Sequence, residues 1–229
     1  MTDAHGADLL EALRHSGFSP RHVYDVGAST GCWTTLAHAV FPLADYHLFE
    51  PLADHDPTYR QGLDQMTAVP GLRTSVYRVA ADRRSGTAVL RVSPDPVGSS
   101  LLPSGPSKHF PDAVDVPTVA LDEFRVQRGL PPPDLIKLDT QGAELRALQG
   151  AERSLQTVSA LIIELWTRPG YGPSTPLFGA VTQWLYLRGF VIGEFGDCWR
   201  DDRGRLTAQD VLFIRPELNV AKQPDREVV

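Results

Sequence analysis

Two carboxylates in this chain each lie at or near the end of a short apolar run. Asp139 follows the run from Leu135 to Leu138, and Glu164 lies inside the run from Leu161 to Trp166. Such runs predict buried strands, and the carboxyl ends of neighbouring parallel strands meet at one edge of a sheet. Because a buried carboxylate is costly unless it is paired, we expect Asp139 and Glu164 to lie together and to work as an acid–base pair.

Other interpretations of these residues stay open. Asp139 is equally suited to cap the helix predicted from Gly142 to Gln149, and Glu144 in its first turn fits the helix dipole as well as a role in the site. His109 is a third candidate base, since its loop could close over a substrate. Two carboxylates could also hold a divalent cation, but such cations usually recruit more oxygen ligands. The sequence therefore leaves a metal undetermined.

A glycine loop nearer the start of the chain indicates a bound nucleoside. The strand predicted from His22 to Val26 runs into a loop whose residues are Gly27, Ala28, Ser29, Thr30 and Gly31. Glycines allow a tight turn and a close backbone approach to a ligand, but their spacing departs from the three-glycine pattern of dinucleotide sites. We therefore predict S-adenosylmethionine as the cofactor, held by Gly27, Ala28, Ser29 and Gly31, with Asp25 beside its ammonium group.

A second carboxylate completes this predicted cofactor site. Glu50 lies nineteen residues beyond Gly31, at the end of the strand predicted from Tyr46 to Phe49, and Pro51 stops that strand. A carboxylate there can accept hydrogen bonds from both hydroxyls of a ribose, so we assign Glu50 and the adjacent Pro51 to the cofactor site. Asp82, after a third strand, could receive the adenine amino group, or could equally belong to a surface turn.

Strands alternate with helices along the chain, which predicts an α/β fold with a mostly parallel, doubly wound sheet whose last strand is antiparallel. A chain of 229 residues with 42% hydrophobic content fits one main domain. We assign residues 1–20 to an N-terminal helical cap, 21–216 to that domain and 217–229 to a flexible tail.

Three segments in the middle of the chain have a less regular pattern. Residues 74–80 predict one strand and residues 87–92 an extra one, whereas prolines from Ser93 to Pro117 predict a long functional loop. The aromatic residues Trp166, Tyr171 and Trp199 could wall a pocket for the acceptor, although such residues are more often part of a core.

Charge and cysteine content exclude several classes of partner. The net charge is −6 and the basic residues are scattered, so nucleic acid and membrane surfaces are not expected partners. Cys32 and Cys198 form neither a disulfide framework nor a zinc motif. With an N-terminus that lacks the apolar core of a signal peptide, these features predict a cytoplasmic protein. The oligomeric state is left undetermined.

With these residues placed, the chain resembles the FkbM-type family of S-adenosylmethionine-dependent methyltransferases from Val23 to Arg215. The segment from Asp134 to Glu144, Asp-Leu-Ile-Lys-Leu-Asp-Thr-Gln-Gly-Ala-Glu, is the most specific landmark. The other landmarks are Asp25-Val26-Gly27-Ala28, Phe49-Glu50-Pro51, Ser99-Ser100-Leu101, Val119-Ala120-Leu121-Asp122, Ile162-Ile163-Glu164 and Asp210-Val211-Leu212-Phe213. One departure is visible, because the family commonly has an acidic residue where this chain has Gln141.

The resemblance implies a Rossmann-like class I methyltransferase fold with seven strands. It also implies O-methyl transfer to a hydroxyl of a small molecule such as a sugar, a glycoside, a polyketide or another secondary metabolite. Two other functions use the same residues and stay open. One is an NAD(P)-dependent oxidoreductase with Glu50 on the ribose, and the other is a non-catalytic nucleotide-binding domain.

Overall fold

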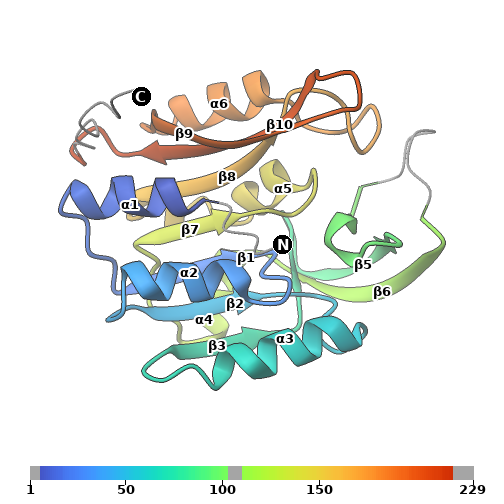
Figure 1. Ribbon diagram of the computed structural model, residues 1–229, viewed down its shortest axis with the longest axis horizontal. Coiled ribbons are helices and arrows are strands. Elements are labelled where there is room, and N and C mark those ends of the chain that lie inside the picture. Colours follow the sequence, from blue (N-terminus) through green and yellow to red (C-terminus); the bar gives the residue numbers. More distant parts are fainter. Residues whose placement is uncertain (1–5, 103–109, 219–229) are drawn as a thin grey trace, which may run out of the picture.

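The computed structural model describes residues 6–102 and 110–218, and its centre is a seven-stranded sheet with the order β3-β2-β1-β7-β8-β10-β9 (Figure 1). The strands are β1 (His22–Val26), β2 (Asp45–Phe49), β3 (Arg73–Tyr77), β7 (Leu135–Leu138), β8 (Ala160–Trp166), β9 (Val191–Arg200) and β10 (Leu206–Ile214). Five neighbouring strands, β3, β2, β1, β7 and β8, run parallel to one another, and β10 is antiparallel to both β8 and β9. The predicted doubly wound sheet with an antiparallel last strand is confirmed.

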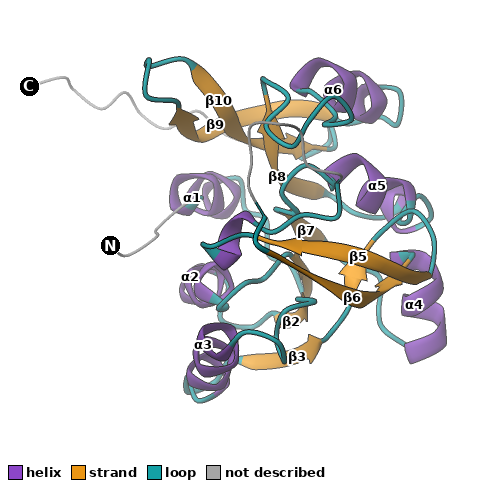
Figure 2. Ribbon diagram, turned by 90° about the vertical axis from the view of Figure 1, so that its right-hand side faces the viewer, coloured by secondary structure: helices purple, strands orange, loops and turns teal. Residues whose placement is uncertain are grey.

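Helices cover both faces of this sheet, because its central strands are apolar on both sides. Seen from the side in Figure 2, α1 (Ala7–His15), α2 (Cys32–Val40) and α3 (Pro57–Thr67) lie on one face. The opposite face carries α4 (Leu121–Arg128), α5 (Glu144–Gln149) and α6 (Phe178–Tyr186). Two large clusters of buried apolar side chains fill the space between the sheet and these two layers. This double burial fixes the register of β1, β7 and β8 and hence the place of the residues at their ends.

The main correction concerns the segment predicted as a long loop, which contains regular structure. Within Ser93 to Pro117 the structure has a short helix η1 (Pro96–Gly98) and most of the eight-residue strand β6 (Asp112–Val119). Strand β6 pairs antiparallel with β5 (Gly86–Val92) and parallel with the two-residue β4 (Ala80–Ala81), which forms a second, three-stranded sheet. Pro117 is tolerated because β4 reaches only the last two residues of β6, so this proline lies where β6 has one neighbour.

The strand predicted for residues 74–80 is also divided, since β3 ends at Tyr77 and β4 begins at Ala80 in the other sheet. Helix α1 packs its buried Leu9, Leu10 and Leu13 over α2 and β9, whereas the assignment of residues 1–20 as a separate cap stays a prediction. Most of the predicted tail, residues 219–229, lies outside the described residues. Among the helices of the described ranges, none has the length and apolar character needed to span a membrane.

Candidate active site

The glycine loop lies between the ends of β1, β2 and β7. Gly27 has a φ of 80°, and a Cβ atom added there would come within 1.9 Å of the Asp139 carbonyl oxygen. Gly31 begins α2 with a φ of 81°, where an added Cβ would meet the Met66 sulfur at 2.6 Å. Ser29 between them has a φ of 52°. Both glycines are therefore required by conformation and by close approach, as the sequence indicated.

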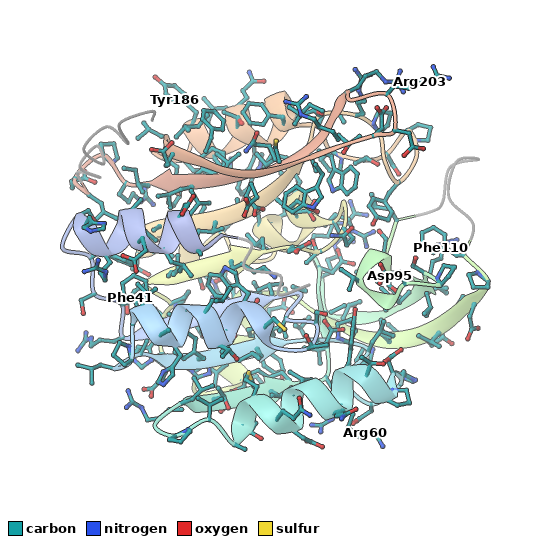
Figure 3. The ribbon with its side chains drawn as sticks, viewed as in Figure 1. Phe41, Arg60, Asp95, Phe110, Tyr186 and Arg203 are labelled. Atoms are coloured by element: carbon teal, nitrogen blue, oxygen red, sulfur yellow. The ribbon has the colours of Figure 1, made fainter. Side chains whose placement is uncertain are left out.

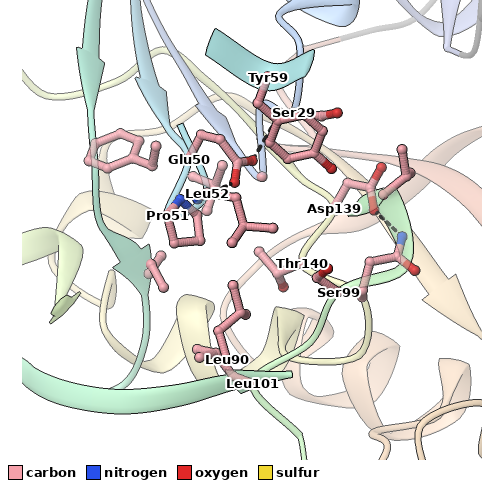
Figure 4. Close-up of a pocket in the computed structure, with 17 residues that line it drawn as sticks. Ser29, Glu50, Pro51, Leu52, Tyr59, Leu90, Ser99, Leu101, Asp139 and Thr140 are labelled. Atoms are coloured by element: carbon pink, nitrogen blue, oxygen red, sulfur yellow. Dashed lines mark hydrogen bonds between the residues drawn. The ribbon is translucent and has the colours of Figure 1, made fainter. Parts of the chain in front are cut away.

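Glu50 is the most completely held carboxylate of the site (Figure 4). Its Oε2 accepts a hydrogen bond from the Ser29 backbone N–H at 2.8 Å, and its Oε1 accepts one from the Leu52 N–H at 2.8 Å. Burial raises the pKa of Glu50 to about 7, while these two backbone donors lower it. Each oxygen keeps a second lone pair, so the side chain can still accept a hydrogen bond from a hydroxyl of a bound ligand.

An apolar pocket opens in front of Glu50, and Figure 4 shows Pro51, Leu90 and Leu101 around it. Its wall is completed by Phe49, Leu52, Tyr59, Ala80, Ala81 and Val97. The extra sheet thus has a clear place in the site, because Ala80, Ala81 and Leu90 come from β4 and β5. A pocket with largely apolar walls and a carboxylate, Glu50, that can accept hydrogen bonds from hydroxyls fits a nucleoside.

Asp25 lies beneath the glycine loop and not in the wall of the cavity. Its carboxylate is fully buried, Thr34 Oγ1 donates a hydrogen bond to Oδ2 at 2.7 Å, and Lys137 Nζ lies 3.4 Å from Oδ1. Lys137 Nζ also donates to the Gly27 carbonyl at 2.9 Å. Burial alone would lower the pKa of Lys137, but the carboxylates of Asp25 and Asp139 raise it above its usual range. Asp25 therefore supports the loop through Lys137, and the predicted contact with an ammonium group stays a prediction.

Asp139 and Glu164 are brought together, and Gln141 joins them. Gln141 Nε2 donates to Asp139 Oδ1 at 2.7 Å and to Glu164 Oε2 at 3.0 Å. The Tyr171 hydroxyl donates to Gln141 Oε1, and Ser100 Oγ donates to the Gln141 carbonyl at 2.7 Å. Burial and the negative charges of Asp139, Glu144 and Asp210 raise the pKa of Glu164 well above its usual range. The side chain that departs from the family pattern is therefore the bridge of the carboxylate pair.

Two further carboxylates have structural partners. Glu144 Oε1 accepts hydrogen bonds from the Thr140 N–H at 3.0 Å, from Thr140 Oγ1 at 3.2 Å and from the Gly142 N–H at 3.0 Å, so it caps the loop before α5. Burial raises its pKa to about 7. Asp82 binds the guanidinium of Arg146 through both oxygens and does not line the pocket. This placement argues against the predicted contact between Asp82 and adenine.

A second, more open cleft of about 670 Å³ lies on the other side of the glycine loop. Asp139, Glu164 and Asp210 form its polar wall, and its aromatic lining comes from Trp33, Trp166, Tyr171 and Trp199. Trp166 packs edge-on against Tyr171, with ring centroids 5.0 Å apart. Asp95, which also lines this cleft, lies with Phe110 on the side of the molecule that carries the small sheet (Figure 3). The predicted aromatic wall and the carboxylate pair therefore share one cavity.

Two points that the sequence left open concern the candidate base His109 and a metal ion. His109 is outside the described residues. In the ranges 6–102 and 110–218, no group of three or more His, Cys, Asp or Glu side chains is arranged to hold a metal ion. Lys137 is the paired side chain that its position in a buried strand indicates, whereas the roles of Gln141 and Asp210 were not predicted. A signal existed for Asp210, which is a charged residue directly before the apolar run Val211-Leu212-Phe213.

Comparison with known proteins supports the family resemblance. The family model of the methyltransferase FkbM domain matches residues 25–192. The hexuronic acid methyltransferase AglP of Haloferax volcanii is 24% identical over 159 residues, which cover 69% of this chain and 61% of that relative. This chain thus matches less than two thirds of the relative's length. A crystal structure of a proposed O-methyltransferase from Klebsiella pneumoniae has a TM-score of 0.50 at 12% identity, covering 92% of this chain and 79% of that one. That structure has the same class I fold.

Proposed function

The chain belongs to the FkbM methyltransferase family, and we propose that it transfers a methyl group from S-adenosylmethionine to a hydroxyl of a small carbohydrate-like molecule. The observation that carries this proposal is the position of the glycine loop between two cavities. Both cavities are lined by Gly27, Ser29, Asp139 and Gln141. One cavity suits a nucleoside and the other suits a polar acceptor, so a group passed between them must cross the loop.

The residues of the first cavity fit this cofactor. Glu50 offers free lone pairs for two ribose hydroxyls, and the apolar side chains of Leu52, Leu90 and Leu101 suit the faces of an adenine ring. Gly27 leaves space that any Cβ would fill. Gln141 and Asp139 reach the same pocket from the end of β7, so the cofactor's reactive end would point towards the carboxylates.

When bound, S-adenosylmethionine supplies an electrophilic methyl group. This chain's residues must then orient an acceptor hydroxyl and take its proton, since an alcohol is protonated at neutral pH. Asp139 and Glu164, the pair predicted from the sequence, line the cleft in which this step would occur, and Gln141 holds one oxygen of each. Fixing these oxygens orients the acceptor without further loss of side-chain freedom.

The lining of the second cleft favours a carbohydrate-like acceptor. Carboxylates bind sugar hydroxyls, and aromatic side chains such as Trp166, Tyr171 and Trp199 cover apolar sugar faces. The relative from Haloferax volcanii is a hexuronic acid methyltransferase, which places sugars first among the acceptors to be tested.

Transfer of label tests this proposal directly. The protein is incubated with S-adenosylmethionine carrying a labelled methyl group and with a panel of methyl glycosides that includes glucosides and glucuronides. We expect label in at least one glycoside and one equivalent of S-adenosylhomocysteine per methyl transferred. A protein that binds S-adenosylhomocysteine but labels no hydroxyl compound would contradict the proposed acceptor class.

A further inference from the structure

Asp210 completes a row of three carboxylates across the sheet. It lies directly opposite Glu164 in the antiparallel pairing of β10 with β8. Asp139 and Glu164 follow Leu138 and Ile163, which are paired in the register of β7 with β8. Directly opposite residues on neighbouring strands point to the same face and have Cβ atoms about 5 Å apart. The three carboxylates therefore line one wall of the open cleft.

The three members of this row differ in how they are held. Asp139 accepts a hydrogen bond from Gln141 and lies 3.7 Å from Lys137 Nζ, and Glu164 accepts from the other amide proton of Gln141. Asp210 is 8% exposed, and across residues 6–102 and 110–218 no side chain or backbone N–H donates a hydrogen bond to its carboxylate. Its carboxylate lines the open cleft, so its oxygens are available to accept a hydrogen bond from a ligand bound there.

The charges around Asp210 suit it to accept a proton near neutral pH. Burial and the negative charge of Asp139 raise the pKa of Asp210 to about 7, Lys137 lowers it, and Asp197 on β9 raises it slightly. Glu164 faces it from β8, and burial together with the negative charges of Asp139, Glu144 and Asp210 raises the pKa of Glu164 well above its usual range. The geometry distinguishes the two opposite carboxylates, because Gln141 holds Glu164 whereas Asp210 has no such donor among the described residues.

We propose that Asp210 is the residue that binds the acceptor hydroxyl and takes its proton, with Glu164 directly opposite it as the second carboxyl group that faces the acceptor. This inference rests on the proposed function. As the new bond forms between the hydroxyl oxygen and the methyl carbon, the bond from that carbon to sulfur breaks and its electron pair stays on sulfur. The hydroxyl proton passes to Asp210, so no further reactant is needed.

The test compares Asp210→Asn with Asp115→Asn, an exposed aspartate on β6 that lies away from both cavities. With the glycoside acceptor found by labelled transfer, Asp210→Asn should lower kcat at least about 100-fold. It should also remove the fall of kcat below pH 7 and leave the Kd for S-adenosylhomocysteine unchanged. Asp115→Asn should match the wild type in all three measurements.

A second readout does not need activity. The raised pKa of Asp210 means that the apo wild type loses stability as the pH rises from about 4 through 7. Asp210→Asn should therefore unfold at a higher temperature than the wild type at pH 8 and lose this advantage at pH 5. Retention of kcat and of its fall below pH 7, or a weakened Kd for S-adenosylhomocysteine, would overturn the assignment of Asp210. A wild type that binds S-adenosylhomocysteine and methylates no hydroxyl would instead overturn the proposed function on which the assignment rests.

Discussion

The two cavities beside the glycine loop are built from different parts of the chain. Around Glu50, the pocket is closed by apolar side chains, and both carboxylate oxygens are fixed by backbone N–H groups. Around Glu164, the cleft is open. The carboxylates of Asp139 and Glu164 are positioned there by other side chains, chiefly Gln141 and Lys137. Backbone donors stay in place when side chains are exchanged, whereas a side-chain network changes with each substitution.

This difference assigns separate tasks to the two regions. The pocket at Glu50 can stay the same while the acceptor changes, and the cleft at Glu164 can be altered without loss of the cofactor. If this division is correct, substitutions in the cleft change kcat and its pH dependence, and substitutions in the pocket change cofactor affinity.

The largest effect is expected from Glu164→Gln. It removes the ionisable carboxyl group that faces Asp210 and leaves the cofactor pocket intact, so kcat should fall about 100- to 1,000-fold while the Kd for S-adenosylhomocysteine stays within about twofold. Steady-state kinetics and calorimetry on the same preparation check this, with Glu11→Gln on the exposed surface of α1 as the matched control. Equal losses in kcat and in cofactor affinity would show that the two regions are not separate.

Glu50→Gln should have the opposite pattern. The amide keeps one acceptor oxygen but turns its N–H₂ group towards the N–H of Ser29 or Leu52, and the charged acceptor for ribose is lost. Charge-assisted hydrogen bonds contribute about 1.5–3 kcal/mol each, so the Kd for S-adenosylhomocysteine should rise about 100-fold. The KM for the acceptor should not change, and a rise in that KM equal to the loss of affinity would contradict the comparison.

A smaller change is expected from Gln141→Glu, which places the acidic residue common in the family between Asp139 and Glu164. Both donated hydrogen bonds are replaced by like-charge contacts, which raise the pKa values of the neighbouring carboxylates. The pH profile of kcat should move to higher pH by about one unit, with about a tenfold loss at pH 7. Gln127→Glu on the exposed side of α4 is the control. An unshifted profile would rule out Gln141 as a positioning residue.

The smallest effect concerns stability. Glu144→Gln keeps the Oε1 atom that accepts all three hydrogen bonds of the loop and removes the buried charge. Since the pKa of Glu144 is raised to about 7, the folded wild type binds its proton more tightly than the unfolded chain and loses stability as the pH rises from about 4.5 to 7. Urea unfolding at pH 5 and at pH 8 measures this loss. From pH 5 to pH 8 the free energy of unfolding should fall by roughly 2 kcal/mol less in the variant than in the wild type. Parallel losses in the two proteins would disprove this role.

The sequence predicted most of the fold because its buried strands and glycine turns are local signals. It missed β6, since Pro117 interrupts the alternation of Val114, Val116 and Thr118, and the pairing with β5 that makes β6 a strand is not visible in the sequence of β6 itself. Asp139 and Glu50 were found because they directly follow buried strands, and Glu164 was found because it is a carboxylate inside an apolar run. The roles of Gln141, Lys137 and Asp210 depend on contacts between segments that are distant in sequence. The pairing of Asp82 with Arg146 depends on such a contact too.

One binding experiment tests the central claim that the pocket at Glu50 holds S-adenosylmethionine. S-adenosylhomocysteine and NADH are titrated separately by calorimetry into the wild type and into Glu50→Gln. We predict that S-adenosylhomocysteine binds the wild type with one site and binds the variant about 100-fold more weakly, and that NADH gives no saturable heat with either protein. Saturable binding of NADH in preference to S-adenosylhomocysteine would contradict the account and favour an oxidoreductase.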